Sequence, residues 1–320
     1  MRIRNYSIVL LILMLWSCNN DSALEKEIAN IEVSFSVERF DKALGEATPK
    51  DLPKLKQTYP FLFSKRIPDS IWASRLNDSL QNELLKEVDI VFGDFEVPTE
   101  ELKGLFQHLK YYDKQFSLPR VVTLTNDVRY RDKIIVNDSL VLIALDSYLG
   151  GDHPFYQNIQ QYIAERLTGD KIVSDIAENY ANKYIYQQKR KTLLDEMIYF
   201  GKLHYFKDVM IPFKSDAEKI GYTSEDLAWA EINENQIWSY FVEEEILFSS
   251  ESKLFGRFIA AAPFSKFYLQ LDNESPGRLG QYIGWQIVRA YANRVDADLF
   301  TIMRTEPDVI FTNSKYKPKK

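Results

Sequence analysis

The stretch Leu140-Val-Leu-Ile-Ala-Leu145, followed by Leu149-Gly-Gly-Asp152, decides the fold expected of this 320-residue chain. Its first six residues are all apolar, which is typical of a buried β-strand. The glycine pair then interrupts the chain, and helical patterns dominate everything after it. We therefore expect an α+β protein, predominantly α-helical with a small mixed sheet, whose mixed half ends near residue 150.

Three segments before this stretch complete the expected sheet. Residues 31–37 alternate apolar and polar side chains, which is the period of a half-buried strand. Residues 121–125 and 134–136 are typical of strands as well. Asn137-Asp138, directly before residues 140–145, is a turn signal.

Helical periodicity predicts the remaining elements. Residues 80–91 place apolar side chains on one face after Ser79. Residues 102–112 do the same, with Thr99 as the expected N-cap after Pro98. The helices expected in the C-terminal half are residues 158–167, 173–188, 193–210, 225–248 with a break near Asn233, and 278–295.

The N-terminus carries the most specific signal in the chain. Two arginines precede an apolar run at residues 8–16, which is too short to span a bilayer but typical of a signal peptide. The run ends at Leu15-Trp16-Ser17-Cys18, which resembles the lipobox of bacterial lipoproteins. By that resemblance the signal peptide, residues 1–17, is cleaved, and Cys18 receives fatty acids such as palmitate on its sulfur and its new amino group.

The lipobox sets the expected organisation of the mature chain. Residues 18–30 form a lipidated tether and residues 31–320 one globular domain. No later stretch has the about 18 apolar residues of a membrane-spanning helix, and several acyl chains anchor a protein stably. We expect a lipid-anchored protein of the cell envelope that faces the periplasm, with inner or outer membrane left open. The alternatives are a plain signal peptide with a cysteine nearby by chance, or a cysteine of the core.

Composition excludes several kinds of site. Forty basic against 46 acidic residues give a net charge of −6, so the chain lacks the basic surface of a nucleic-acid-binding protein. A single cysteine excludes a thiolate zinc site, and His108, His153 and His204 lack the His-Glu-x-x-His spacing of zinc hydrolases. Glycine-rich phosphate loops and a Gly-x-Ser-x-Gly elbow are absent, although a Ser-His-Asp triad stays open. We expect neither metal nor cofactor.

Three stretches form a set: Leu142-Ile-Ala-Leu-Asp-Ser-Tyr-Leu-Gly-Gly-Asp152, Met197-Ile-Tyr-Phe-Gly-Lys-Leu-His-Tyr-Phe206 and Gly280-Gln-Tyr-Ile-Gly-Trp-Gln-Ile-Val288. With the lipobox and the overall length, they resemble the gliding motility lipoprotein GldB family of Bacteroidetes over essentially the whole mature chain. The resemblance implies an envelope lipoprotein needed for gliding, in organisms where gliding is coupled to type IX secretion. Its implied partners are the membrane and components of those machineries.

Ala177-Glu178-Asn179-Tyr180-Ala181 and Phe200-Gly201 lie in two consecutive expected helices after the sheet. This order distantly resembles zincin-type predicted zinc-dependent proteases, in which a His-Glu-x-x-His helix precedes a helix with a Glu-Gly ligand step. Glu178 takes the place of the general base, but Ala177, Ala181 and Phe200-Gly201 replace the ligands. Without metal there is no activated water, so the resemblance implies a degenerate zincin-like fold and a pseudoenzyme. Ala-Glu-x-x-Ala also occurs by chance in amphipathic helices.

Aromatic residues of the late helices have two interpretations, whereas two glycines there indicate helix packing. Tyr199, Tyr205 and Trp285 could line a groove for a peptide or glycan, or fill the core between helices, which is the favoured interpretation. Gly280 and Gly284, four residues apart, admit the close approach of another helix, so we expect a packing role.

Three functions are consistent with these observations. The favoured one is a non-catalytic lipoprotein that supports the gliding and type IX secretion machinery through protein contacts. The alternatives are a hydrolase of envelope peptide or glycan that uses Glu178, and a lipoprotein that binds peptidoglycan through an aromatic groove.

Overall fold

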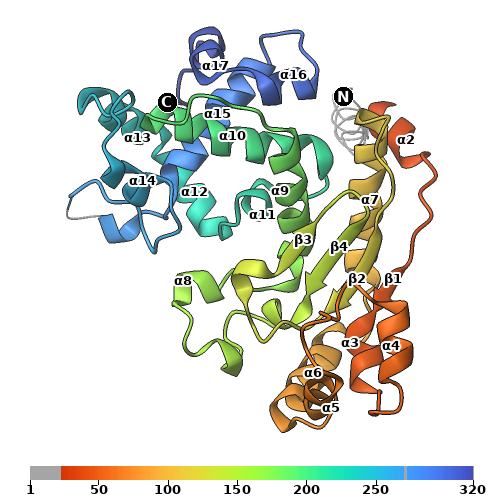
Figure 1. The fold of residues 1–320 in the computed structure, drawn as a ribbon. Coiled ribbons are helices and arrows are strands. Elements are labelled where there is room, and N and C mark those ends of the chain that lie inside the picture. Colours follow the sequence, from red (N-terminus) through yellow and green to blue (C-terminus); the bar gives the residue numbers. More distant parts are fainter. Residues whose placement is uncertain (1–22, 270–271, 320) are drawn as a thin grey trace, which may run out of the picture.

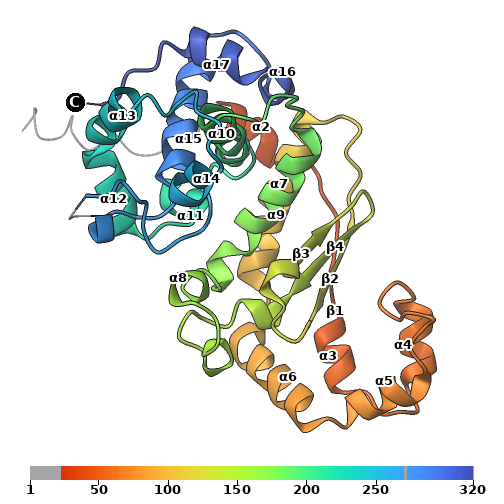
Figure 2. The ribbon, with the colours of Figure 1, turned by 60° about the vertical axis from the view of Figure 1, so that its left-hand side comes forward.

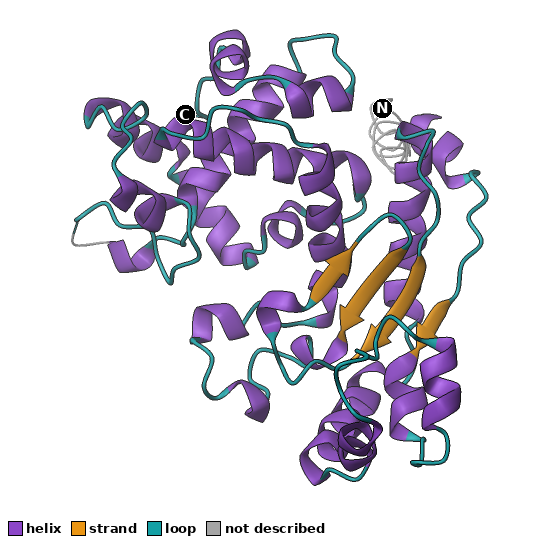
Figure 3. Cartoon of the chain, viewed as in Figure 1, coloured by secondary structure: helices purple, strands orange, loops and turns teal. Residues whose placement is uncertain are grey.

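A four-stranded mixed sheet organises the N-terminal half of the chain (Figures 1 and 3). The computed structural model describes residues 23–269 and 272–319. The first three strands in spatial order are parallel, and the last is antiparallel to its neighbour. That order is β1 (Val37–Arg39), β2 (Arg120–Leu124), β4 (Leu140–Ala144) and β3 (Ile134–Val136).

The β3–β4 hairpin confirms the turn signal, and β1 corrects an expectation. Asn137 donates its N–H to the Leu140 carbonyl at 2.9 Å and closes the turn. β1 starts only at Val37, whereas a strand was expected over residues 31–37. Its register pairs Val37 with Val121. Pro119, the residue directly before β2, has no N–H that could extend the pairing toward residue 31.

Two long helices continue from the sheet toward the C-terminal half, α7 (Glu96–Tyr112) and α9 (Ile172–Tyr184) (Figure 2). α7 starts three residues before Thr99, so the expected N-cap there is wrong. Pro98 is tolerated within the first helical turn, where its missing N–H would have had no partner. The Thr99 hydroxyl instead donates to the Phe95 carbonyl.

Helix α2 (Ala23–Ala29) lies within the segment expected to be a tether and packs against α7. Ile28 is 1% exposed, and the Gln107 amide donates to the carbonyls of Ala29 and Ile31 at 2.9 and 3.0 Å. Folded structure therefore begins before residue 31. Cys18 and the signal peptide lie outside the described residues.

The other helices follow the expected pattern, with shorter ends. Residues 193–210 are helical as expected, and Asn233 separates two helices. The helix expected over residues 158–167 shrinks to one turn, and that over 173–188 ends at Tyr184. The remaining bounds are α3 (Phe40–Gly45), α4 (Leu52–Thr58), α5 (Asp69–Leu76), α6 (Ser79–Phe92), α8 (Gln161–Ala164), α10 (Leu193–Met210), α11 (Asp216–Ile220), α12 (Ser224–Ile232), α13 (Glu234–Glu243), α14 (Ser252–Phe258), α15 (Leu279–Ala292), α16 (Leu299–Arg304) and α17 (Pro307–Ser314).

Helices α10 and α15 cross in close backbone contact at two glycines. A Cβ on Gly201 would lie 2.3 Å from the Gly284 carbonyl oxygen, and one on Gly284 would lie 1.8 Å from that of Met197. Gly280 faces the backbone of Phe258 in the same way. The packing role expected of Gly280 and Gly284 is confirmed.

A single buried apolar cluster extends from α7 and the sheet to α9, α10 and α15, so the two halves share a core. A smaller cluster under α3 and α4 covers the other side of β2 at Val122. Within the described ranges, no helix is both long and apolar enough to cross a membrane.

Candidate functional site

A charged centre forms where α9, α10 and α15 converge. Lys207 of α10 donates from Nζ to Glu178 Oε2 of α9 at 2.7 Å and to the Lys219 carbonyl at 2.9 Å. The Lys207 side chain is 3% exposed, whereas that of Glu178 is 38% exposed. Burial by itself would raise the pKa of Glu178, but the charge and hydrogen bond of Lys207 outweigh it and lower the pKa to about 2. Glu178 is therefore an anion held by an internal cation.

His204, on the same helix as Lys207, completes this centre in its neutral form. Gln281 of α15 donates its amide N–H to the Ile259 carbonyl at 2.8 Å, which turns its oxygen toward His204 Nε2 at 3.0 Å. Nε2 is therefore assigned the proton, and the buried Nδ1 has no partner in the described structure. Burial, followed by the charge of Lys207, lowers the pKa of His204 to about 3.

The free Nδ1 lone pair raises the question of a zinc ion, and the surrounding residues do not fit one. A zinc site needs at least three protein ligands. No group of three His, Cys, Asp or Glu side chains that could hold a metal ion occurs in residues 23–269 and 272–319. The Lys207 ammonium lies against the Glu178 carboxylate and would repel a divalent cation there.

The positions aligned with zincin ligands serve helix packing. Ala177 and Ala181 are 0% exposed and belong to the shared core. Gly201 lies in the α10–α15 crossing, and the Phe200 ring is 6.4 Å from that of Phe255. Of the five aligned residues, the structure brings only Glu178 into a polar cluster.

The three aromatic residues considered for a groove lie in different surroundings. Trp285 is 0% exposed, and its indole N–H donates to Asp208 at 2.8 Å. Tyr199 is half-buried beneath the Arg190 guanidinium, 3.6 Å from its ring centre. Tyr205 is half-buried against the core. A groove made of all three would need Trp285 at the surface.

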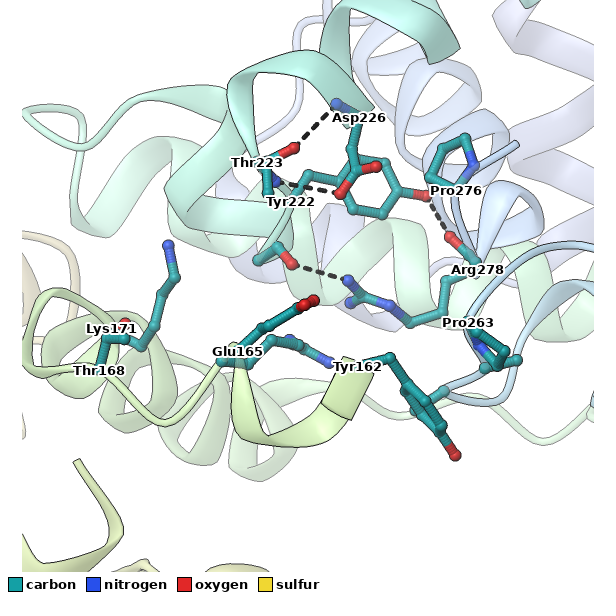
Figure 4. Close-up of a pocket in the computed structure, with 15 residues that line it drawn as sticks. Tyr162, Glu165, Thr168, Lys171, Tyr222, Thr223, Asp226, Pro263, Pro276 and Arg278 are labelled. Carbon is teal, nitrogen blue, oxygen red and sulfur yellow. Dashed lines mark hydrogen bonds between the residues drawn. The ribbon is translucent and has the colours of Figure 1, made fainter. Parts of the chain in front are cut away.

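A cavity of about 280 Å³ opens near the charged centre (Figure 4). Its walls come from the α8 region, from residues 221–223, and from the two loops at 261–263 and 276–278. In Figure 4 the Arg278 side chain extends across it toward the loop of Tyr222, with Lys171 and Thr168 on one side and Pro263 on the other. Sequence reasoning missed this cavity because its residues are far apart in the chain.

Arg166 and Arg278 bring two positive charges into this cavity. Arg278 is 8% exposed and donates to the carbonyls of Ile220 at 2.7 Å and Gly221 at 2.9 Å. Burial and then the Arg166 charge lower the pKa of Arg278 to about 9. Arg278 also has a φ of 64°, an uncommon conformation for a residue with a side chain, directly before α15.

The comparison over the whole chain decides the family. A family model described as Gliding motility protein GldB matches residues 21–318. The chain belongs to the GldB family. The comparisons with curated proteins and with solved structures gave no match.

Family membership confirms the resemblance drawn from three stretches of sequence. In the GldB fold these stretches include the end of β4 with the turn after it, the middle of α10, and most of α15. Two of them therefore form the α10–α15 crossing at Gly201 and Gly284, and they supply His204 and Gln281 to the charged centre. The family is that of a gliding motility lipoprotein, and with the structure it describes a mostly helical protein with a small mixed sheet.

Proposed function

We propose that this GldB protein is a lipid-anchored, periplasm-facing envelope protein that supports the gliding and type IX secretion machinery through contacts with other proteins, without catalysing a reaction. The observation that carries this proposal is the family match over residues 21–318, nearly the full chain. The lipobox at Cys18 supports the anchor, since it leaves the folded part tethered to the membrane by acyl chains. Confinement to a membrane raises the effective concentration of partners, so even weak contacts suffice.

The absence of catalysis is supported by the partner that Glu178 already has. A general base must be free to take a proton near the pH at which it works. The Lys207 ion pair lowers the pKa of Glu178 to about 2, so the carboxylate is a poor base and is engaged by a cation. The order of sheet, α9 and α10, with Glu178 on α9, supports a degenerate zincin scaffold as the origin of the fold.

The test compares two replacements in gliding cells. Cys18→Ala is expected to release the protein from the membrane fraction and abolish gliding. Glu178→Gln is expected to leave gliding at wild-type speed, because the carboxylate performs no chemistry. Immunoblotting of membrane and soluble fractions checks that the amount of each protein is normal.

Two outcomes would overturn the proposal. Normal gliding with Cys18→Ala at wild-type abundance would remove the role of the anchor. Loss of gliding with Glu178→Gln, while the protein stays folded and at normal abundance, would instead favour a hydrolase of envelope peptide or glycan.

A further inference from the structure

The cavity beside the charged centre contains an arginine without a protein partner. The Arg166 guanidinium makes no hydrogen bond and no ion pair to any residue in the described ranges, and its Nε is fully buried. A buried N–H without a partner is costly, and more so when it belongs to a charged group, although the Arg166 residue as a whole is only half-buried. Its cost is small only if a group outside the protein accepts its hydrogen bonds.

A second arginine increases this cost. Arg278 lies close enough for the Arg166 charge to lower its pKa, so two like charges share one enclosed space. The direct partners of Arg278 are two neutral carbonyl oxygens, and the charges of Glu178 and Asp226 act on it only from beyond ion-pair distance. The fold therefore concentrates positive charge here and does not neutralise it by direct contact.

The acidic residues nearby are engaged elsewhere or too distant. Asp226 belongs to the capping box of α12, in which it accepts from the Thr223 N–H at 3.2 Å. Glu178 is in direct contact with Lys207, and its charge reaches Arg166 and Arg278 only at longer range. Glu165 is exposed at the edge and, like the other two, forms no ion pair within 4 Å of Arg166 or Arg278 in the described structure.

We propose that this cavity binds a terminal oxyanion, a carboxylate or a phosphate, at the end of a small organic ligand or chain, with Arg166 as its main partner and Arg278 as the second. Arginine is well suited to such groups because its planar N–H donors match two oxygens at once. The volume of about 280 Å³ is at the small end of ligand pockets, so it fits a chain end or a small molecule. Pro263 and Pro276 supply apolar contact for the organic part.

Gly221 shapes the site around Arg166. A Cβ on Gly221 would lie 2.7 Å from one terminal nitrogen of Arg166 and 3.0 Å from its Nε. Its φ of 70° also favours glycine. The bare backbone of Gly221 therefore lets the guanidinium approach the cavity wall more closely than any residue with a Cβ would allow.

The test is calorimetric titration of the full-length protein in detergent. The probes are inorganic phosphate, an N-acetylated dipeptide with a free carboxylate, and the same dipeptide as its C-terminal amide. We expect the phosphate or the free dipeptide to bind with one site per chain, and the amide not to bind. Binding of phosphate alone assigns a phosphate ligand, and binding of the free dipeptide alone assigns a carboxylate.

Arg166→Gln separates a ligand contact from a structural role. Because Arg166 has no partner to lose, this variant is expected to melt at a higher temperature than wild type without ligand, yet to bind the oxyanion at least about tenfold more weakly. Arg304→Gln, which changes an exposed arginine on α16, is the matched control and should change neither property. Absence of binding by both oxyanion probes, or equal binding by wild type and Arg166→Gln, would overturn the proposal.

Discussion

Gly284→Ala tests whether the α10–α15 crossing holds the helical half together. The new Cβ would lie 1.8 Å from the Met197 carbonyl oxygen and 2.4 Å from its carbonyl carbon. Both contacts are to backbone, so no side chain can rotate away. The two helices would have to separate by about 1 Å or more to reach an ordinary contact distance. That movement would also stretch the 3.0 Å contact between His204 on α10 and Gln281 on α15.

The expected cost follows from two opposing effects. Alanine improves helix propensity over glycine by about 1 kcal/mol. Overpacking in a core costs about 1–3 kcal/mol when side chains can adjust, and more when backbone must move. Since α10 and α15 bury Met197, Ile283 and Ile287 in the shared core, separating them also opens voids. We expect a net loss of about 3 kcal/mol in the free energy of unfolding.

Urea unfolding followed by circular dichroism measures this loss. Gly256→Ala is the control, because Gly256 lies within helix α14 and a Cβ there would meet nothing within 4 Å. It should stabilise the protein by up to about 1 kcal/mol. A free energy of unfolding for Gly284→Ala within about 1 kcal/mol of wild type would refute the account of the crossing.

Two further predictions concern buried charges on α10. Lys202 is 0% exposed and donates to the Thr305 carbonyl at 2.6 Å, and burial lowers its pKa to about 8. Between pH 8 and 10.5 the unfolded chain therefore binds more protons than the folded one. Over that window the free energy of unfolding of the wild type should rise relative to that of Lys202→Met, by up to about 3 kcal/mol. Urea unfolding at several pH values measures this, and parallel pH profiles for the two proteins would contradict it. Glu178→Gln leaves Lys207 buried without its anion and should cost about 1–2 kcal/mol, whereas adding Lys207→Met should recover most of it. Equal melting temperatures for the single and double variants would show that the pair is not coupled.

The regular elements could be predicted where local chemistry decides them. Residues 193–210 form a helix with the expected bounds because Thr192 and Asp195 make a capping box at its start. Asn233 marks the break between α12 and α13 for a similarly local reason, since its amide bonds back to the Trp229 carbonyl. The strand expected at residues 31–37 is shorter because Pro119, directly before the neighbouring strand β2 and far away in sequence, has no N–H to extend the pairing.

The candidate site depends on tertiary contacts and was therefore less visible. Glu178 was singled out from its sequence context, but its partner Lys207 follows only from how α9 and α10 pack. One signal was available, since Lys202 and Lys207 interrupt a helix that is otherwise apolar on several faces. The approach of Arg166 to Arg278 had no such signal, because no local pattern connects residues so far apart.

The zinc content of the purified protein tests the central claim, that Glu178 belongs to a non-catalytic charged centre, most directly. The full-length protein would be extracted in detergent without chelator and its metals measured by elemental analysis. With Lys207 paired to Glu178 and alanines at positions 177 and 181, we predict far less than one zinc ion per chain. One tightly bound zinc ion per chain would contradict this account.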